Sequence, residues 1–233
     1  MGYLPIFLNA AGLKCMVVGG GQSAEHKTEA LLLAKAAVIV VSPRLTPALA
    51  AMASRGEITH LNREYRRGDM KGCALVYAAT GDDAVHRAIA AEARELGIPL
   101  NVADDPELCS FIAPAVVRQG ALQIAISTGG ASPAFASRVR RELEPQFGPE
   151  LGPMLDILRA ARGRLRALIA DSSERARRLT ALANSDLPVA LRAGDSTVVE
   201  RLLHEHLGDG FGLGELGIGP SLIGPAHRHR VPD

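Results

Sequence analysis

Over the first hundred residues, short apolar runs alternate with longer segments of mixed polarity. The apolar runs, rich in Val, Ile and Leu, predict strands near 14–19, 37–41, 57–61, 73–78 and 98–103. The segments between them predict helices near 22–35, 46–55 and 82–96. The runs do not alternate strictly between apolar and polar positions, as expected when both faces of a sheet are covered. Alternating strands and helices indicate a parallel sheet with right-handed crossovers. We therefore predict a Rossmann-type α/β domain over residues 1–112.

The pattern changes after residue 112. Two apolar runs, 112–117 and 121–126, flank Gly120 and predict a hairpin. A basic helix is expected from about 134 to 144. Beyond Pro149 leucines recur at helical spacing. We predict a small α+β segment over 113–148, a helical domain over 149–208, and a Gly- and Pro-rich flexible tail over 209–233.

Composition and charge narrow the class of protein. The chain has 233 residues, of which 47% are hydrophobic, so it can bury a substantial core. Its formal net charge of +1 and its 3% of aromatic residues argue against a nucleic-acid partner. No run reaches the about 18 consecutive apolar residues that predict a transmembrane helix, so no membrane partner is expected. Three widely spaced cysteines form no disulfide framework, which indicates a reducing, cytoplasmic setting.

The richest motif is the run from Lys14 to Ala24, KCMVVGGGQSA, in which an apolar strand flows into a glycine turn and then a helix. Gly19, Gly21 and Ala24 give the pattern G-x-G-x-x-A. In a dinucleotide site the first glycine permits the tight turn, the second lets a pyrophosphate approach, and the third small residue lets the helix pack closely. The helix N-terminus then offers N–H groups to the phosphates. The alternative is a tight turn in a domain that binds no nucleotide.

The turns after the second and fourth strands carry further cofactor candidates. The second strand ends in Ser42-Pro43-Arg44 and lacks the acidic residue that would hold the ribose diol of NAD. Ser42 can make one hydrogen bond to that ribose, and Arg44 leaves room for a 2′-phosphate. Thr80 is placed to line the cofactor, while the Asp82-Asp83 pair favours helix capping. The residues predict a dinucleotide without choosing between NAD and NADP.

Two adjacent carboxylates, Asp104 and Asp105, follow Asn101 at the end of the fifth strand. Carboxylates at the carboxyl end of a parallel strand are well placed for acid–base chemistry. The alternative is that they shape the turn before Pro106. Asp104 directly ends the strand and is the better catalytic candidate.

A polar, glycine-rich loop over 127–132 leads into the basic helix and resembles an anion-binding turn. The alternative is an ordinary N-cap by Ser132 before Pro133, which can coexist with ligand binding. The substrate-binding candidates are Asn101, Ser127, Thr128, Gly129, Gly130 and Ser132.

Ten arginines lie between residues 138 and 178, against six acidic residues in the same stretch, a local net charge of +4. Most are expected to be solvated helix faces, and a minority to bind a polyanionic substrate. Two histidine pairs, His204/His206 and His227/His229, lack the i, i+4 spacing that aligns two ligands on a helix, so no metal site is predicted.

Taken together, the motifs resemble the precorrin-2 dehydrogenase domain of siroheme synthase. The resemblance covers residues 1 to about 147, and the helical segment beyond 150 agrees with the family only in general character. The motifs that carry it are YLPIF at 3–7, VVGGGQSAEHK at 17–27, AAT at 78–80, NVAD at 101–104, SFIAP at 110–114 and ISTGGASP at 126–133.

The resemblance implies an activity and roles for particular residues. The family oxidises precorrin-2 to sirohydrochlorin with NAD⁺, and some members also insert Fe²⁺. It is dimeric, with a central segment, here about 113–147, exchanged between protomers. Asp104 matches the key catalytic residue, Thr128 matches a phosphorylatable serine, and the NAD contacts fall at Gln22, Ser23, Pro43 and Arg44. The substrate's eight carboxylates would give the arginines a partner.

The chain departs from the usual sequence of the family at two positions, and alternative functions also stay open. His26 and His86 stand where the family usually has Arg and Asn, which bears on cofactor affinity. A Rossmann oxidoreductase for another polyanion and an NAD(H)-binding sensing module without turnover are competing hypotheses. The sensing module leaves Asn101 to Asp104 unexplained. Fe²⁺ insertion and modification of Thr128 stay open.

Overall fold

The computed structural model describes residues 2–219, which fall into two compact units. The first extends to Ala113 and includes residues 129–131, and the second begins at Pro114. The predicted boundary between residues 112 and 113 thus lies within one residue of the observed one. The predicted division at residue 148 has no counterpart, because hairpin and helices belong to one unit.

The first unit is built on five parallel strands in the order β3-β2-β1-β4-β5. They are β1 (Lys14–Val18), β2 (Ala37–Val41), β3 (Ile58–Leu61), β4 (Leu75–Ala78) and β5 (Leu100–Val102). The predicted parallel sheet is confirmed, with most strands somewhat shorter than the apolar runs. The order reverses between β1 and β4, and ligands of such sheets bind outside the carboxyl ends of the strands at that point.

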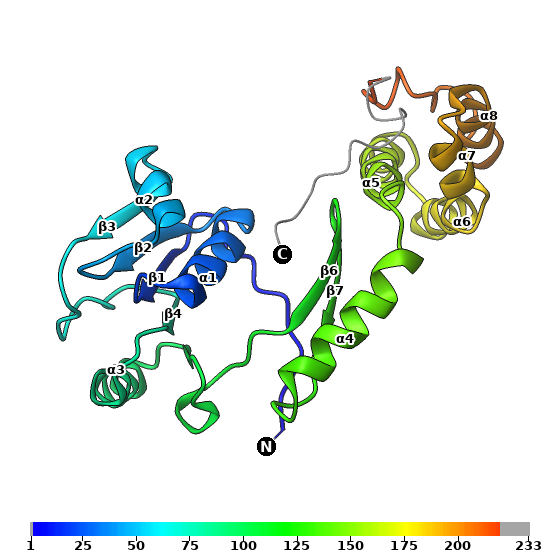
Figure 1. Cartoon of the computed structure of the whole chain (residues 1–233). Helices are drawn as coiled ribbons and strands as arrows, with labels where there is room; N and C mark the ends of the chain where they lie inside the picture. Colours follow the sequence, from blue (N-terminus) through cyan, green and yellow to red (C-terminus); the bar gives the residue numbers. More distant parts are fainter. Residues whose placement is uncertain (1, 220–233) are drawn as a thin grey trace. The chain divides into compact units, whose positions relative to one another are not determined.

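Helices cover both faces of the sheet (Figure 1). One core cluster joins α1 (Gln22–Leu33) and α2 (Pro47–Ser54) to alternate residues of β1 and β2. A second cluster joins α3 (Asp83–Leu96) to the intervening residues of the same strands. Cys15 and Met16, neighbours on β1, therefore face opposite cores and are both fully buried. This explains why the strand sequences do not alternate in polarity. A short 3₁₀ turn, η1 (Pro106–Leu108), follows β5.

The second unit opens with an antiparallel hairpin of β6 (Ala115–Gln119) and β7 (Leu122–Ile126). The hairpin is confirmed, but its first strand begins three residues later than predicted, after Pro114, which has no N–H to donate to a ladder. Its turn contains Gly120 at φ +57°, and a Cβ there would lie 2.7 Å from the Cα of Gly152. The hairpin therefore approaches the start of the next long helix backbone to backbone.

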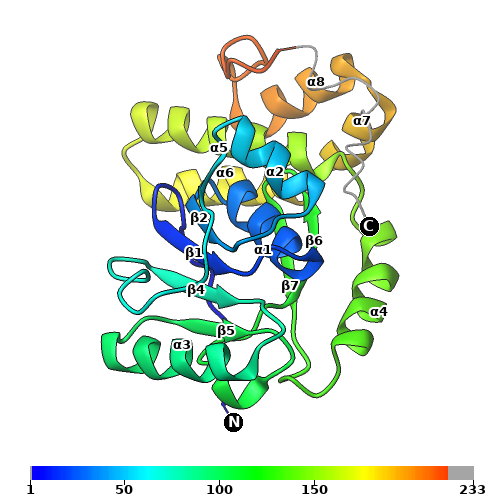
Figure 2. The same ribbon diagram turned by 60° about the vertical axis from the view of Figure 1, so that its left-hand side comes forward.

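Helices make up the rest of the second unit (Figure 2). They are α4 (Pro133–Leu143), η2 (Glu144–Gln146), α5 (Leu151–Leu168), α6 (Ser172–Ala183), α7 (Leu187–Ala193) and α8 (Ser196–Leu207). Ile157 and Leu165 of α5 pack with Leu182 of α6 and Leu203 of α8 in a core from which water is excluded. The predicted leucine period of α5 is confirmed only in part, because Leu165 is fully buried whereas Leu155 and Leu158 are half-buried and Leu168 is 61% exposed.

The predicted flexible tail from residue 209 is wrong for its first part. Phe211, Leu213 and Leu216 are buried at 3%, 7% and 9% exposure in the same core as α5 and α8. The high glycine content misled the sequence analysis, because three apolar anchors among glycines are sufficient to fix the segment. Residues 220–233 of the predicted tail, including His227 and His229, lie outside the described residues.

Among the described helices, none is long and apolar enough to cross a membrane.

Candidate functional site

The turns after β1 and β4 meet where the strand order reverses. Gly19 adopts φ +123°, which only glycine tolerates easily, and a Cβ at this position would collide with the carbonyl oxygen of Ala79. The predicted role of Gly19 in a tight turn has a clear steric basis. It places the first glycine turn directly against the turn that carries Thr80.

Gly20 is equally constrained, although the sequence motif allows any residue at this position. A Cβ on Gly20 would collide with the carbonyl oxygen of Arg44 and lie 2.7 Å from Ser42 Oγ. The Thr46 N–H donates to the Gly20 carbonyl at 2.9 Å, which ties the turn after β1 to the turn after β2. The three consecutive glycines thus have different functions, and only the middle one holds these two turns together.

Gly21 faces open space, because a Cβ added there would meet no atom within 4 Å. It is the N-cap of α1, and no side chain caps this helix, whose first bond runs from Glu25 N–H to the Gly21 carbonyl at 3.0 Å. Gln22 and Ser23 are exposed, whereas Ala24 is fully buried against the sheet. An uncapped helix start beside an open glycine fits a dinucleotide pyrophosphate, because the first N–H groups of a helix lack internal partners.

The turn after β2 is shaped by its own serine. Ser42 is 8% exposed, and its Oγ donates to the Arg44 carbonyl at 2.7 Å and accepts from the Arg44 N–H at 3.3 Å. His60 of β3 adds a contact of 2.8 Å to the Ser42 carbonyl. Pro43 and Arg44 are exposed beyond it, on the open side of the turn. Contacts of Ser42, Pro43 and Arg44 with a cofactor stay predictions.

The turn after β4 rests on a buried histidine that the sequence analysis noted only as a departure. His86 is 5% exposed, and its Nε2 accepts from the Thr80 N–H at 3.3 Å. The Thr80 hydroxyl accepts from the Asp82 N–H, also at 3.3 Å. Asp82 is the N-cap of α3, accepting from the N–H groups of Ala84 and Val85, so the capping interpretation is confirmed.

The turn after β5 holds Asp104 in an unusual backbone conformation. Asp104 is exposed and has φ +62°, in the left-handed region that Asp and Asn tolerate better than other non-glycine residues. Cys109 anchors the turn, because its Sγ accepts from the Val102 N–H at 3.1 Å and lies 3.3 Å from the Asp105 carbonyl. Burial raises the pKa of the Cys109 thiol, so the anchor stays protonated.

Asn101 faces back into the protein. Its Nδ2 donates to the Phe111 carbonyl at 3.0 Å, and the residue is half-buried. Asn101 thereby fixes the chain that follows η1 against β5. The structure places Asn101 on β5 and Asp104 in the turn that follows, and it gives Asn101 a positioning contact that its spacing alone did not reveal.

An aromatic pair and a lysine lie beside this turn, and sequence reasoning missed both. Tyr77 of β4 meets Phe111 edge-on with ring centroids 5.4 Å apart, and burial raises the pKa of Tyr77 to about 12. The Nζ of Lys27, on α1, lies 5.4 Å from the Tyr77 ring centroid. Burial lowers the pKa of Lys27, against the opposing influence of the Asp104 charge.

The glycine-rich loop over 127–132 is held by its own hydroxyl groups. Thr128 Oγ1 accepts from the Ser132 N–H at 3.0 Å and donates to the Ser132 carbonyl at 3.1 Å. Ser132 Oγ accepts from the Phe135 N–H at 3.1 Å, which makes Ser132 the N-cap of α4 before Pro133. The N-cap alternative is confirmed. Ser127, Gly129 and Gly130 are exposed, and their substrate contacts stay a prediction.

Most arginines of the helical region serve local structure. Several pair with acids one turn away, as Arg138 does with Glu142 at 2.7 Å and Arg140 with Glu144 at 3.0 Å. Others bond to carbonyl groups at helix ends, as Arg175 does with Ile169 at 2.7 Å. Most members of the cluster thus have a structural role.

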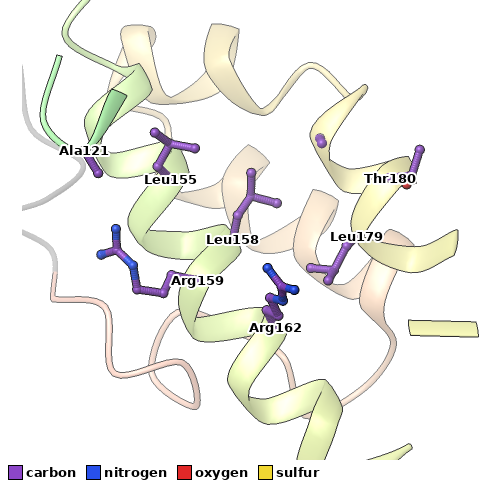
Figure 3. Close-up of a pocket in the computed structure, with 8 residues that line it drawn as sticks. Ala121, Leu155, Leu158, Arg159, Arg162, Leu179 and Thr180 are labelled. Carbon is purple, nitrogen blue, oxygen red and sulfur yellow. The ribbon is translucent and has the colours of Figure 1, made fainter. Parts of the chain in front are cut away.

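A shallow pocket of about 520 Å³ lies in the second unit beside two of these arginines (Figure 3). Leu155, Leu158 and Leu179 line it, with Arg159 and Arg162 from α5 at its side. Arg159 pairs with Asp156 at 2.8 Å. The pocket contains none of the predicted site residues.

Within residues 2–219 no group of three or more His, Cys, Asp or Glu side chains is arranged to hold a metal ion. His204 lies 3.7 Å from Glu200 and 3.9 Å from Asp209, contacts of an exposed surface.

Comparison with known proteins agrees with this geometry. A family model described as "Putative NAD(P)-binding" matches residues 6–115, and one described as the central part of a sirohaem biosynthesis protein matches residues 119–146. The siroheme synthase of Azotobacter vinelandii is 36% identical over 225 residues, which cover 94% of this chain and 48% of that protein. The chain belongs to the siroheme synthase N-terminal family. It therefore carries an NAD(P)-binding domain.

A second siroheme synthase shows a similar degree of sequence identity. The protein from Gluconacetobacter diazotrophicus is 42% identical over 180 residues, covering 76% of this chain and 38% of that protein. The chain therefore spans about half of the length of the first relative and less than half of the second. Among solved structures, the protein titled "SirC, precorrin-2 dehydrogenase" superposes with a TM-score of 0.70 at 22% identity, covering 87% of this chain and 98% of that one, and so shares its fold.

Proposed function

We propose that this chain oxidises precorrin-2 to sirohydrochlorin with NAD⁺ as the hydride acceptor. The observation that carries the proposal is the turn after β5, which holds an exposed Asp104 at φ +62° on the sheet edge where α1 begins uncapped. Family membership and the name of the related fold support the same reaction. A sensing module without turnover would need no carboxylate in such a conformation.

The residues divide the chemistry between them. NAD⁺, when bound, takes a hydride, and the oxidation also releases one proton from the substrate. Gln22 and Ser23 at the start of α1, with Pro43 and Arg44 after β2, are exposed. In this proposal they hold the cofactor. Asp104, as a carboxylate, accepts the proton, and the Cys109 anchor keeps the turn in place while it does so.

A pair of conservative variants tests Asp104. Asp104→Asn removes the charge but keeps a side chain that tolerates φ +62°, whereas alanine would add about 1 kcal/mol of backbone strain and confuse the result. We expect Asp104→Asn to lose most NADH formation while its Tm and its affinity for NAD⁺ stay unchanged. Asp105→Asn, at the neighbouring carboxylate, serves as the control and should keep near-normal turnover. Equal losses in both variants would contradict a specific role for Asp104.

We also propose that the protein works as a homodimer. The sheet of β6 and β7 has only two strands, so each has an outer edge that pairs with no other strand among the described residues. Large apolar side chains are exposed near the N-terminus and on α4, including Leu4 at 83%, Phe7 at 71% and Phe135 at 53%. Light scattering should give twice the 24.5 kDa of one chain. A mass of one chain at micromolar concentration would refute the dimer.

Insertion of Fe²⁺ would be a separable second step in which the ion is a substrate. Adding Fe²⁺ to completed anaerobic reactions tests it, since siroheme formation above the rate without enzyme would establish insertion. We place the protein in the cytoplasm because its three cysteines, two of them buried, are all free thiols.

A further inference from the structure

Lys27 is a cationic side chain of the first unit that is withdrawn from solvent without an anionic partner among the described residues. It is half-buried on α1, and its Nζ lies over the Tyr77 ring, 5.4 Å from the centroid. In the part of the chain that the structure describes it forms no ion pair and donates no hydrogen bond. A partly desolvated ammonium without an anionic partner costs stability, which a cation–π contact offsets only in part.

The position of Lys27 relative to the site is fixed by the sheet register. Tyr77 pairs with Asn101 across β4 and β5, and Phe111 packs edge-on against Tyr77 while accepting from Asn101. The lysine therefore stands over β4, the strand next to β5, whose following turn carries Asp104. Asp104 acts on its charge without contacting it and favours the ammonium, while burial opposes it.

The cofactor's pyrophosphate is not the natural partner of this ammonium. Lys27 is five residues beyond Gln22, about 7 Å along the axis from the start of α1. The proposed pyrophosphate site is at the start of this helix, where the space beside Gly21 is open. The Lys27 head instead reaches along the sheet toward β4 and the turn after β5, on the side where the substrate must meet Asp104.

We propose that Lys27 is a substrate-positioning residue whose ammonium binds a carboxylate arm of the tetrapyrrole beside Asp104. The inference rests on the proposed function for the identity of the substrate. Precorrin-2 is a polycarboxylate, and a charge-assisted contact to one arm fixes the orientation of the macrocycle toward the proton acceptor. The Tyr77 ring holds the lysine in place until the carboxylate arrives.

Three variants separate this role from a structural one. Lys27→Met keeps length and packing without the charge, Lys27→Arg keeps the charge, and Lys71→Met removes an exposed lysine elsewhere in the unit. We expect Lys27→Met to raise the KM for precorrin-2 about tenfold or more, with kcat changed less than about threefold. Lys27→Arg should restore most of the affinity and Lys71→Met should match wild type. The Tm of Lys27→Met should be unchanged or higher, because the unpaired ammonium is gone.

Other outcomes would overturn the inference. A lower Tm with an unchanged KM would make Lys27 a structural residue that only packs on Tyr77. A weaker affinity of Lys27→Met for NAD⁺, with the KM for precorrin-2 unchanged, would assign the lysine to the cofactor.

A binding assay keeps this inference separate from the proposed function. Uroporphyrin, a stable tetrapyrrole with eight carboxylates, is titrated into each protein and followed by its fluorescence. If wild type binds it and Lys27→Met binds about tenfold more weakly while no variant forms NADH, the positioning role stands and the dehydrogenase proposal fails. If wild type forms NADH but Lys27→Met binds uroporphyrin equally well, the positioning role fails alone.

Discussion

The carboxyl edge of the sheet and the helical core of the second unit use the chain in different ways. At the sheet edge, backbone groups approach each other so closely that Gly19 and Gly20 leave no room for a Cβ. In the helical core, large side chains such as Ile157, Leu165 and Leu203 fill the space between helices. The first arrangement leaves helix N–H groups and a carboxylate facing outward, and the second leaves a closed interior. This difference is why we expect the proposed proton transfer and cofactor binding in the first unit.

Charged residues show the same contrast. Arg164 donates to the Gly210 carbonyl at 2.7 Å, and Arg178 bonds to the Leu207 carbonyl at the end of α8. These arginines stabilise the second unit by satisfying carbonyl groups at and beyond the helix end. Lys27 and Asp104 in the first unit have no comparable local partners among the described residues. We therefore base the proposed site on these two residues and not on the density of charge in the second unit.

The largest effect is expected at the glycine turn. Gly20→Ala should cost about 4 kcal/mol in the free energy of unfolding and abolish NAD⁺ binding, because the new methyl group meets the Arg44 carbonyl. Gly21→Ala, where the space is open, should fold normally and weaken only NAD⁺ binding. Urea denaturation and NAD⁺ titration measure both effects. Similar stabilities for the two variants would break the claimed difference between adjacent glycines.

A core truncation in the second unit should leave the site intact. Leu203→Ala removes a fully buried side chain of α8 and should cost about 3 kcal/mol in the free energy of unfolding. Affinity for NAD⁺ should not change, since Leu203 belongs to the helical core alone. Val189→Ala, at a position 61% exposed, is the control and should cost little. A loss of NAD⁺ binding in Leu203→Ala would show that the helical unit supports the cofactor site.

A smaller effect is expected from pH. Burial of Glu150 opposes its ionisation, but the ion pair with Arg192 outweighs burial and lowers the pKa of the carboxyl below its ordinary 4.5. The pair therefore contributes stability that is present above about pH 4.5 and lost as the pH falls through the lower folded value. Urea midpoints between pH 3 and pH 7 should fall on the acid side. Glu150→Gln should flatten that dependence, and an unchanged slope would remove Glu150 as its source.

The smallest expected effect is a gain in the free energy of unfolding. Thr28 of α1 is fully buried, and its hydroxyl has no hydrogen-bond partner among the described residues. Thr28→Val keeps the shape and removes the unsatisfied group, so it should raise the free energy of unfolding by about 1 kcal/mol. Thr46→Val is the contrast, because that hydroxyl bonds to Glu25 at 2.6 Å and caps α2, so its loss should destabilise. A destabilised Thr28→Val would imply an unseen partner for the hydroxyl.

Much of the fold could be predicted from the sequence, because the apolar runs of the sheet and the leucine period of the helices are local signals. Gly19 and Asp104 could also be found, since each follows closely on a strand. Gly20 could not, because its constraint comes from Arg44, a residue in the next turn. Lys27 and Tyr77 are brought together by tertiary packing of α1 on β4 and carry no motif. The order of the segment around Phe211 could not be predicted, because its high glycine content is typical of flexible chain although three of its apolar side chains are buried.

The most direct test of the account is the stoichiometry of an anaerobic reaction of the wild-type protein with precorrin-2 and NAD⁺. Absorbance follows NADH and sirohydrochlorin together. The account predicts one NADH for each sirohydrochlorin, with most of both lost when Asp104→Asn replaces wild type. Binding of NAD⁺ without NADH formation would contradict the enzyme and favour a sensing module.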